Sequence, residues 1–391
     1  MNDVPMITTP EQLRELCERV RTAARVGIDT EFHNERSYTA RLMVVQLAFE
    51  DGFAIVDPLA LDDLAPLAQA LCETTVVGHA LSSDLKIFAD KWDIVPPDVF
   101  DCQVAAAFLG YGMAISLADL VRDLCGTRLK KSQTVSDWSA RPFSEKQLEY
   151  LVDDVAHLLD MQDKLTQCLR EKGRYEWAIE ECRLLADVDR YRSEERRMYS
   201  RIPGANRMNR RELGVLSEIV KLRDRLARER DLPLKYVMPD DVVGGLATVR
   251  PRTFDDLAQL RRLDPGTRRA LGPLILEAVK RGESLDEADL PAKFSRPLGN
   301  ARETLVSLMS VVVGELAQEN ELPPSLLAPR ACLERVAREV PGSREDFERV
   351  LGLSHWRTQL VAEPLWRLLS GQSLLCIEGY ATGDPRISLK S

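Results

Sequence analysis

Histidine is scarce in this sequence, and its cysteines are poorly spaced for binding a metal. The chain contains 4 His among 391 residues, and no two of its 8 Cys are separated by only two to four residues. Both facts argue against a zinc site built from His and Cys. A catalytic metal would therefore be held by carboxylates, which favour Mg²⁺ or Mn²⁺. Because a chain of this length needs no disulfides, we expect reduced thiols and a cytoplasmic location.

Long apolar runs and an excess of positive charge are also missing, and a secretory leader is not expected. The apolar runs fall far short of the roughly 18 residues that a membrane-spanning helix needs, and the N-terminus has neither a basic nor an apolar leader region. We therefore expect no membrane partner. The net charge of −9 excludes a protein that coats nucleic acid through its overall charge, but it leaves room for a local basic surface.

The first half of the chain alternates short β-branched runs with helical patterns. Strands are expected over residues 26–32, 42–49, 53–56 and 75–78, the second and third forming a hairpin. Helices are expected over residues 61–72, 85–92 and 143–169, the last as one long helical region with a cap at Ser144. This order predicts an α/β domain with an antiparallel component.

The charge changes sign after about residue 185, where strand-like runs almost vanish. Residues 190–230 contain 13 Lys and Arg against 6 Asp and Glu, whereas residues 1–150 contain 14 against 23. The basic stretch is either a solvated helix surface or a surface for nucleic acid. Its candidate contacts are Arg190, Arg192, Arg196, Arg197, Arg207, Arg210 and Arg211, with a second patch at Arg261, Arg262, Arg268 and Arg269.

The helical half contains a weak internal repeat. Residues 227–233 resemble residues 317–323, and Pro273 and Pro364 lie inside the last helical pattern of each copy. Two helical domains are therefore expected. The predicted division of the chain is an α/β domain at 1–185, a basic linker at 186–208, helical domains at 209–286 and 298–375 joined by a linker at 287–297, and a tail at 376–391.

Two carboxylates share one face of the first expected strand. Side chains alternate along a strand, so Asp29 and Glu31 point the same way, beside the apolar residues Ile28 and Phe32. Two like charges next to a core are costly unless a divalent cation neutralises them. The alternative is an edge strand with two solvent-facing acids.

Three further residues complete a candidate site. Asp84 lies near the start of the helix that follows strand 75–78, and Tyr150 and Asp154 share one helix face because they are four residues apart. Taken alone, Tyr150 is equally an ordinary half-buried tyrosine. Together the set suits phosphodiester hydrolysis, in which two metals about 3.5–4 Å apart activate water and stabilise the leaving oxygen. A tyrosine can orient or deprotonate that water.

The order of these residues resembles the three exonuclease motifs of the DEDD superfamily. The motifs are Asp29-x-Glu31, His79-Ala80-x-x-x-Asp84 and Tyr150-x-x-x-Asp154, and the tyrosine marks the Tyr-type branch. The rest of the first half is similar to the ribonuclease D family, most specifically from Lys131 to Trp138 and at Arg141-Pro142. The two helical repeats resemble the paired helicase-and-RNase-D C-terminal (HRDC) domains of that family. One departure is Leu151-Val152-Asp153, where the family usually has small residues.

The resemblance implies both a fold and an activity. The fold is an α/β ribonuclease H-like exonuclease domain followed by two all-α HRDC domains. The activity is that of a metal-dependent 3′→5′ exoribonuclease, which shortens tRNA precursors and other small structured RNAs and releases nucleoside 5′-monophosphates. The implied cofactors are two divalent cations, Mg²⁺ or Mn²⁺. RNA is the implied partner, and the protein is expected to be a monomer.

The resemblance also implies a role for each motif residue. Asp29 would bridge both metals, Glu31 and Asp154 would hold the metal that activates water, Asp84 would serve the second metal, and Tyr150 would position the nucleophile. Candidate substrate contacts, weighed apart from the resemblance, are Phe32, Gln46, His79, Gln103, Lys130, Lys131 and Arg141. Structural hydrogen bonding is the alternative for His79 and the preferred interpretation for Gln46 and Gln103. Core packing is expected for Trp138, in preference to stacking on a base.

Two other functions stay open from the sequence. The first is a 3′→5′ exonuclease that acts on DNA, because HRDC domains also occur in DNA helicases; a helicase P-loop is absent from the chain. The second is a nucleic-acid-binding adaptor with a vestigial nuclease, which the intact carboxylates disfavour.

Overall fold

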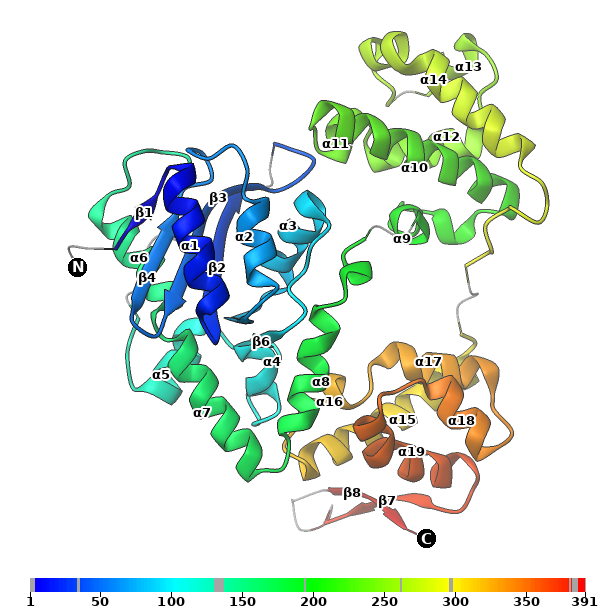
Figure 1. Ribbon diagram of the computed structural model, residues 1–391. Coiled ribbons are helices and arrows are strands. Elements are labelled where there is room, and N and C mark those ends of the chain that lie inside the picture. The colour runs from blue at the N-terminus through cyan, green and yellow to red at the C-terminus, as the bar shows by residue number, and fades with distance from the viewer. Residues whose placement is uncertain are drawn as a thin grey trace.

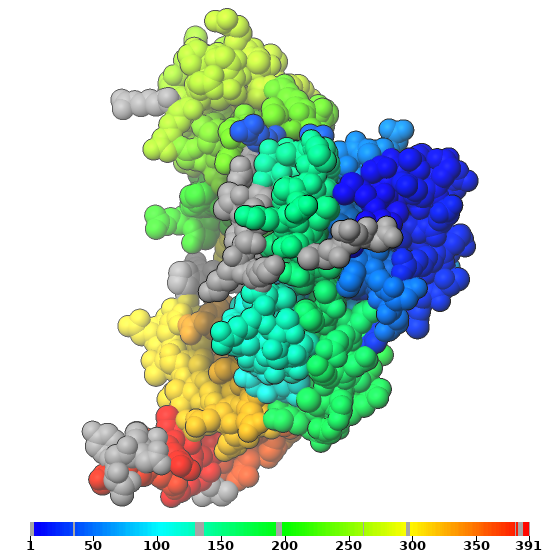
Figure 2. All heavy atoms as spheres, turned by 90° about the vertical axis from the view of Figure 1, so that its left-hand side faces the viewer, coloured from blue at the N-terminus to red at the C-terminus, as the bar shows by residue number. Residues whose placement is uncertain are grey.

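The protein consists of one α/β domain and two helical regions (Figure 1). The computed structural model describes residues 4–33, 36–129, 137–192, 195–260, 262–294, 298–379, 381 and 386–390, with only the backbone at 195–197. We call residues 209–286 the first helical region and residues 298–375 the second helical region. Both lie along the same side of the α/β domain, one above the other (Figure 2).

A mixed six-stranded sheet forms the centre of the α/β domain. Its order is β1-β4-β3-β2-β5-β6. The strands are β1 (Met6–Ile7), β2 (Arg25–His33), β3 (Arg41–Phe49), β4 (Gly52–Val56), β5 (Thr75–Gly78) and β6 (Val99–Asp101). The central β2 pairs antiparallel with β3 and parallel with β5, and β3 and β4 form the expected hairpin. The α/β prediction with an antiparallel component is therefore confirmed.

Helices cover both faces of this sheet. One face packs against α1 (Pro10–Thr22), α2 (Ala65–Leu71) and α3 (Ser82–Trp92). The other packs against α4 (Cys102–Ala107), α5 (Leu117–Cys125), α6 (Glu145–Ala156) and α7 (Leu158–Glu171). All of β3 beyond Arg41 is buried, because a strand covered on both faces must be apolar on both. Next along the chain, α8 (Tyr175–Leu185) packs against β6 and α4.

Two helix predictions need correction. The long helix expected over 143–169 is two helices, α6 and α7, which meet at His157. The break follows from packing, since α6 lies on β2, β3 and β4 while α7 turns toward α4, α5 and β5. The helix expected over 61–72 is shorter, because α2 begins at Ala65 with a proline in its first turn, where proline is favoured.

The two helical regions repeat the same order of long and short helices (Figure 1). The first contains α10 (Arg210–Arg230), α11 (Leu234–Val237), α12 (Asp240–Val249), α13 (Phe254–Ala258) and α14 (Pro265–Ser284). The second contains α15 (Asn300–Glu319), α16 (Pro324–Leu327), α17 (Arg330–Glu339), α18 (Arg344–Leu351) and α19 (His355–Leu369). The short segments η1 (Val188–Arg190), α9 (Glu195–Ser200) and η2 (Ala205–Arg207) precede them.

The repeat extends to unusual backbone angles. Asp231 and Glu321 have φ values of 46° and 51°, and Arg250 and Val340 have φ values of 52° and 48°. A left-handed conformation is uncommon for residues other than glycine, and least favourable for a β-branched valine. Its recurrence at equivalent turns therefore shows that the weak sequence repeat is a repeat of backbone structure.

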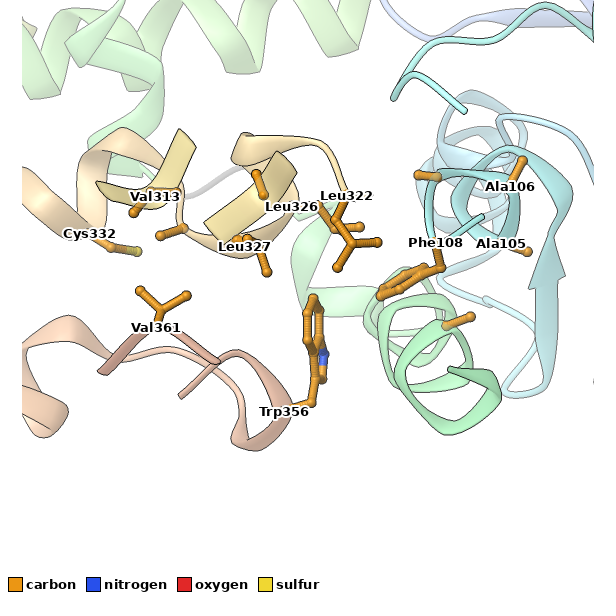
Figure 3. Packing of buried hydrophobic residues seen from close by; sticks show 14 of the residues in the cluster. Ala105, Ala106, Phe108, Val313, Leu322, Leu326, Leu327, Cys332, Trp356 and Val361 are labelled. Carbon is orange, nitrogen blue, oxygen red and sulfur yellow. The ribbon is translucent and has the colours of Figure 1, made fainter. Parts of the chain in front are cut away.

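The second helical region shares its hydrophobic core with the α/β domain. Trp356 of α19 lies 5.2 Å from the Phe108 ring of the α/β domain, and Figure 3 shows the two side chains pointing toward one another. The first helical region contacts the α/β domain through Tyr38, whose ring packs on the apolar core of that region and lies 4.8 Å from the Arg228 guanidinium carbon. The Tyr38 hydroxyl donates to Asp224 at 2.5 Å, and its backbone N–H donates to Asp231 at 3.0 Å.

The C-terminal segment folds back as a hairpin of β7 (Leu374–Glu378) and β8 (Arg386–Lys390), which packs on α15. The expected boundary at residue 375 therefore falls inside β7, since Leu375 and Leu389 join the shared core. The eight cysteines form no disulfide. Among the helices that the structure describes, none has the length and apolar character needed to cross a membrane.

Candidate active site

Strand β2 and helix α6 bring three carboxylates together. Asp29 and Glu31 project from the face of β2 that α6 covers, and Asp154 faces them from α6. One oxygen from each carboxylate lies within 4.8 Å of the others. The side chains of Asp29 and Glu31 therefore lie on the same face of β2, as their two-residue spacing predicted. The start of α6 is fixed by a capping box. The Ser144 hydroxyl accepts a hydrogen bond from the Gln147 backbone N–H, and the Gln147 side-chain oxygen accepts one from the Ser144 backbone N–H.

Asp84 joins the cluster from the first turn of α3. Its side chain is buried, with 6% of the residue exposed, and it accepts a short hydrogen bond from the Thr30 hydroxyl. The sequence analysis did not identify Thr30 as a partner of Asp84, although its position between Asp29 and Glu31 could have suggested a supporting role. The hydrogen bond fixes the direction of the Asp84 carboxylate toward the end of β2.

Burial and mutual repulsion make full ionisation of these carboxylates unfavourable. Burial, followed by the charges of Asp84, Asp154 and Glu31, raises the pKa of Asp29 well above its usual value. Burial, followed by the charges of Asp154 and Asp84, raises the pKa of Glu31 to about 7. Burial raises the pKa of Asp154 to about 7 and that of Asp84 to about 6. A bound cation would favour the ionised form of all four.

This donor set fits a hard divalent cation. It offers carboxylate oxygens from three separate elements, and such oxygens are the ligands that Mg²⁺ and Mn²⁺ prefer. Asp29, Glu31 and Asp154 are close enough to share one ion, and Asp84 lies near enough to raise the pKa of Asp29.

Tyr150 lies one helical turn before Asp154, and its phenol lowers the pKa of that carboxyl, against the rise that burial causes. Burial and the charges of Asp154, Glu31 and Asp29 raise the pKa of Tyr150 above its usual value. Its phenol therefore keeps its proton in this environment. Of the two roles open to it, orienting a water fits better than removing a proton from it.

His79 and Gln103 have structural partners. His79 Nε2 lies 3.0 Å from the Ile115 carbonyl oxygen, and Gln103 Nε2 donates to the same oxygen at 3.0 Å. Burial lowers the pKa of His79. Nearby, Asp101 accepts from the backbone N–H groups of Ala80 and Leu81. These contacts hold the turn that leads into α3, and they favour the structural alternative for both residues.

Two of the expected substrate contacts need correction. Gln46 is fully buried, opposite Asp29 on β3, and neither polar atom of its side chain has a hydrogen-bond partner. Arg141 uses all five guanidinium N–H groups on Asp57 and on the carbonyls of Met43, Trp138 and Ala140. Because Gln46 is buried, it does not reach a bound RNA. Because Arg141 donates all its N–H groups within the protein, it has no free donor for a phosphate.

Phe32 is placed where a nucleotide could reach it. It is half-buried just beyond Glu31 and lines a cavity of about 620 Å³ between the α/β domain and the first helical region. Arg201, Lys235 and Tyr38 line the same cavity. Lys130 and Lys131 lie outside the described residues, as do Arg261 and the side chains of Arg196 and Arg197.

Several arginines of the basic stretch serve the fold. Arg192 pairs with Asp93 and Asp189, and Arg210 and Arg211 donate to carbonyls near Glu287. These arginines therefore already make ion pairs and hydrogen bonds within the protein. Trp138 packs in the core as expected, with 5% of the residue exposed and its ring 6.2 Å from that of Phe143.

Comparison with known proteins supports this geometry. A family model of a 3′–5′ exonuclease matches residues 4–170, and an HRDC domain model matches residues 212–279. A ribonuclease D from Granulibacter bethesdensis is 34% identical over 381 residues, which cover 96% of this chain and 94% of that protein. A ribonuclease D from Nitrobacter hamburgensis is 35% identical over 378 residues, which cover 95% and 97%.

The fold agrees as well. The crystal structure of Escherichia coli RNase D superposes with a TM-score of 0.81 at 29% sequence identity, covering 94% of this chain and 99% of the other. The agreement thus includes the sheet, the carboxylate-bearing elements and both helical regions. Relatives that align over nearly their whole length, together with the matching exonuclease model, show that this chain belongs to the ribonuclease D family.

Proposed function

We propose that the protein is a metal-dependent exoribonuclease that hydrolyses RNA from its 3′ end and releases nucleoside 5′-monophosphates. The observation that carries the proposal is the convergence of Asp29, Glu31 and Asp154, with Asp84 and Tyr150 beside them. Membership of the ribonuclease D family supports both the direction of cleavage and RNA as substrate.

Two divalent cations, Mg²⁺ or Mn²⁺, complete the proposed site. Glu31 and Asp154 would hold one of them and Asp84 the other, with Asp29 between the two. When bound, the cations would supply Lewis-acid activation of water and stabilise the charge on the leaving oxygen. The raised pKa values of the four carboxylates support this assignment, because a cluster built for cations is electrostatically unfavourable without them.

Other side chains would position the attacking water, the carboxylates and the RNA. The protonated Tyr150 phenol would orient the attacking water, while a hydrogen bond from it would keep the Asp154 carboxylate in place. The Thr30 hydroxyl fixes Asp84 in the same manner. Phe32 would contact the last base of the RNA, and the cavity lined by Phe32, Arg201 and Lys235 would take the strand upstream of it.

Small structured RNAs with 3′ tails, such as tRNA precursors, are the proposed substrates. The Escherichia coli relative is described as an exoribonuclease involved in structured RNA processing. In this chain the first helical region lines the cavity beside Phe32, where it would meet the folded body of an RNA whose tail is being shortened. The net negative charge of the α/β domain fits such a division, because most RNA affinity would come from the helical half.

The second helical region is proposed to be a further HRDC-like domain. Support comes from its matching order of helices, from Pro364 at the place of Pro273, and from the left-handed residues Glu321 and Val340 at the places of Asp231 and Arg250. The division of the chain expected from the sequence, except for the boundary at residue 375, belongs to the same proposal. A cytoplasmic monomer also belongs to it, in keeping with eight free cysteines.

The test uses purified full-length protein and a tRNA with a 3′ extension, labelled at its 5′ end. With Mg²⁺ or Mn²⁺ the RNA should shorten stepwise from its 3′ end and stall near the acceptor stem, and EDTA should stop the reaction. A single-stranded DNA of equal length is the matched control. Shortening of DNA alone would favour the DNA exonuclease, and binding without shortening of either strand would favour the adaptor.

A further inference from the structure

The segment just before α6 is bound tightly to the sheet. Arg141 Nε donates to Asp57 Oδ2 and Arg141 Nη2 donates to Asp57 Oδ1, both at 2.7 Å. Asp57 is 4% exposed and directly follows β4. Arg141 also donates to the carbonyl of Trp138 at 2.7 Å and to that of Met43 on β3 at 2.9 Å. A bidentate pair of this kind has a single favourable geometry, so it fixes the backbone around Trp138.

These contacts place the Trp138 ring between the sheet and the catalytic helix. Its centroid is 6.2 Å from that of Phe143 and 5.6 Å from that of Tyr150. It packs in one cluster with Val44, which lies opposite Glu31 in the β2–β3 ladder. The indole is therefore on the same face of the sheet as the carboxylates.

The Trp138 indole lies close enough to Glu31 to lower the pKa of that carboxyl, against the rise that burial and Asp154 cause. The nearest phenol, that of Tyr150, lies beside Asp154. An indole nitrogen is a donor only, so a hydrogen bond from Trp138 would favour the ionised carboxylate and leave the other lone pairs of Glu31 for a cation.

We propose that Trp138 is a positioning residue, which orients the Glu31 carboxylate for a divalent cation, and that the Asp57–Arg141 pair holds Trp138 in place. The inference rests on the proposed metal-dependent function and deepens it. It gives the Trp138 and Arg141 segment, which none of the exonuclease motifs includes, a part in the same site.

The principal test is the substitution Trp138→Phe, which keeps an aromatic ring and removes the N–H. The full-length protein is titrated with Mn²⁺, and free Mn²⁺ is followed by electron paramagnetic resonance. We expect about tenfold weaker binding, the scale of a hydrogen bond to a charged group. The matched control is Trp92→Phe, the same truncation on α3 away from the site, for which binding should stay within about twofold of wild type.

Activity separates positioning from catalysis. At saturating Mn²⁺ the kcat of Trp138→Phe should return to within about threefold of wild type, because the residue acts only through Glu31. A kcat that stays at least about a hundredfold low at saturating metal would overturn the positioning role, and so would Mn²⁺ binding within twofold of wild type.

A spectroscopic measurement covers the case in which Trp138→Phe folds poorly. In protein labelled with ¹⁵N-tryptophan, the indole N–H signal of Trp138 should move when Glu31 is replaced by Ala, and it should respond to Mg²⁺. A signal unaffected by Glu31→Ala would overturn the inference alone. A wild-type protein that neither binds Mn²⁺ nor shortens RNA would overturn the proposed function and the inference with it.

Discussion

Trp356 stacks on Trp177, with ring centroids 5.1 Å apart and ring planes 14° from parallel. The first residue belongs to α19 of the second helical region and the second to α8 of the α/β domain. Beside the stack, Arg357 and Glu181 form an ion pair at 2.5 Å with both side chains largely buried. The second helical region is therefore held by a continuous core, whereas the first contacts the α/β domain through the ring and the polar groups of Tyr38.

Replacing Trp356 by Ala should loosen this junction. The fully buried indole would leave a cavity, and truncations of this kind cost about 3–5 kcal/mol of unfolding free energy. Denaturant unfolding followed by circular dichroism measures the loss. Leu308→Ala on the exposed side of α15 is the control and should cost less than about 1 kcal/mol. Equal stability of the two variants would contradict the shared core.

Replacing Tyr38 by Phe should loosen the contact between the first helical region and the α/β domain without unfolding either. The change removes only the hydroxyl that donates to Asp224, at a cost of about 1 kcal/mol. Small-angle scattering should show a larger radius of gyration, and shortening of a structured RNA should slow more than that of a single-stranded one. Tyr236→Phe, at an exposed ring, is the control. An unchanged radius would show that other contacts hold the region.

Replacing Asp29 by Asn should remove turnover and leave the fold intact. The substitution takes away a central cation ligand, and we expect a loss of at least about a hundredfold in RNA hydrolysis. Without metal the variant should be more stable than wild type near pH 8, by about 2–4 °C in melting temperature, because one repelling charge is gone. The exposed Asp62→Asn is the control. Retention of most activity would show that the site is wrongly assigned.

Stability and metal binding should depend on pH in opposite directions. The pKa values of Glu31 and Asp154, about 7, and of Asp84, about 6, lie above their usual values, so the folded protein binds more protons than the unfolded chain between about pH 4 and 7. The contribution of these groups to stability is therefore fully present below that window and is lost as the pH rises through it.

Cations need the ionised carboxylates, and so their effect should grow over the same window. Mg²⁺ should raise the melting temperature little at pH 5.5 and by several degrees at pH 8, and Mn²⁺ affinity should rise at least about tenfold between pH 6 and 8. Differential scanning fluorimetry and calorimetric titration measure the two quantities. A pH-independent Mg²⁺ effect, or an equal effect in Asp29→Asn, would contradict the carboxylate site.

Much of the candidate site could be predicted because its pattern is local. The two-residue spacing of Asp29 and Glu31 and the four-residue spacing of Tyr150 and Asp154 follow from the geometry of a strand and a helix. Burial could not be predicted in this way. Gln46 reads as an available polar residue in the sequence, and only the covering of β3 by α6 removes it from substrate.

The sequence by itself determined the four strands β2 to β5, the start of α6 at Ser144, the repeat of the helical half and the residue types of the carboxylate cluster, but not the short strands β1 and β6 or the hairpin of β7 and β8. Only the tertiary structure decided that the helical run breaks at His157 and that the Arg141 guanidinium binds Asp57. It also decided that Trp356 joins the second helical region and the α/β domain into one core. The reason is physical. Periodicity and capping act over a few residues, whereas packing partners are chosen between segments that the chain separates by tens or hundreds of residues.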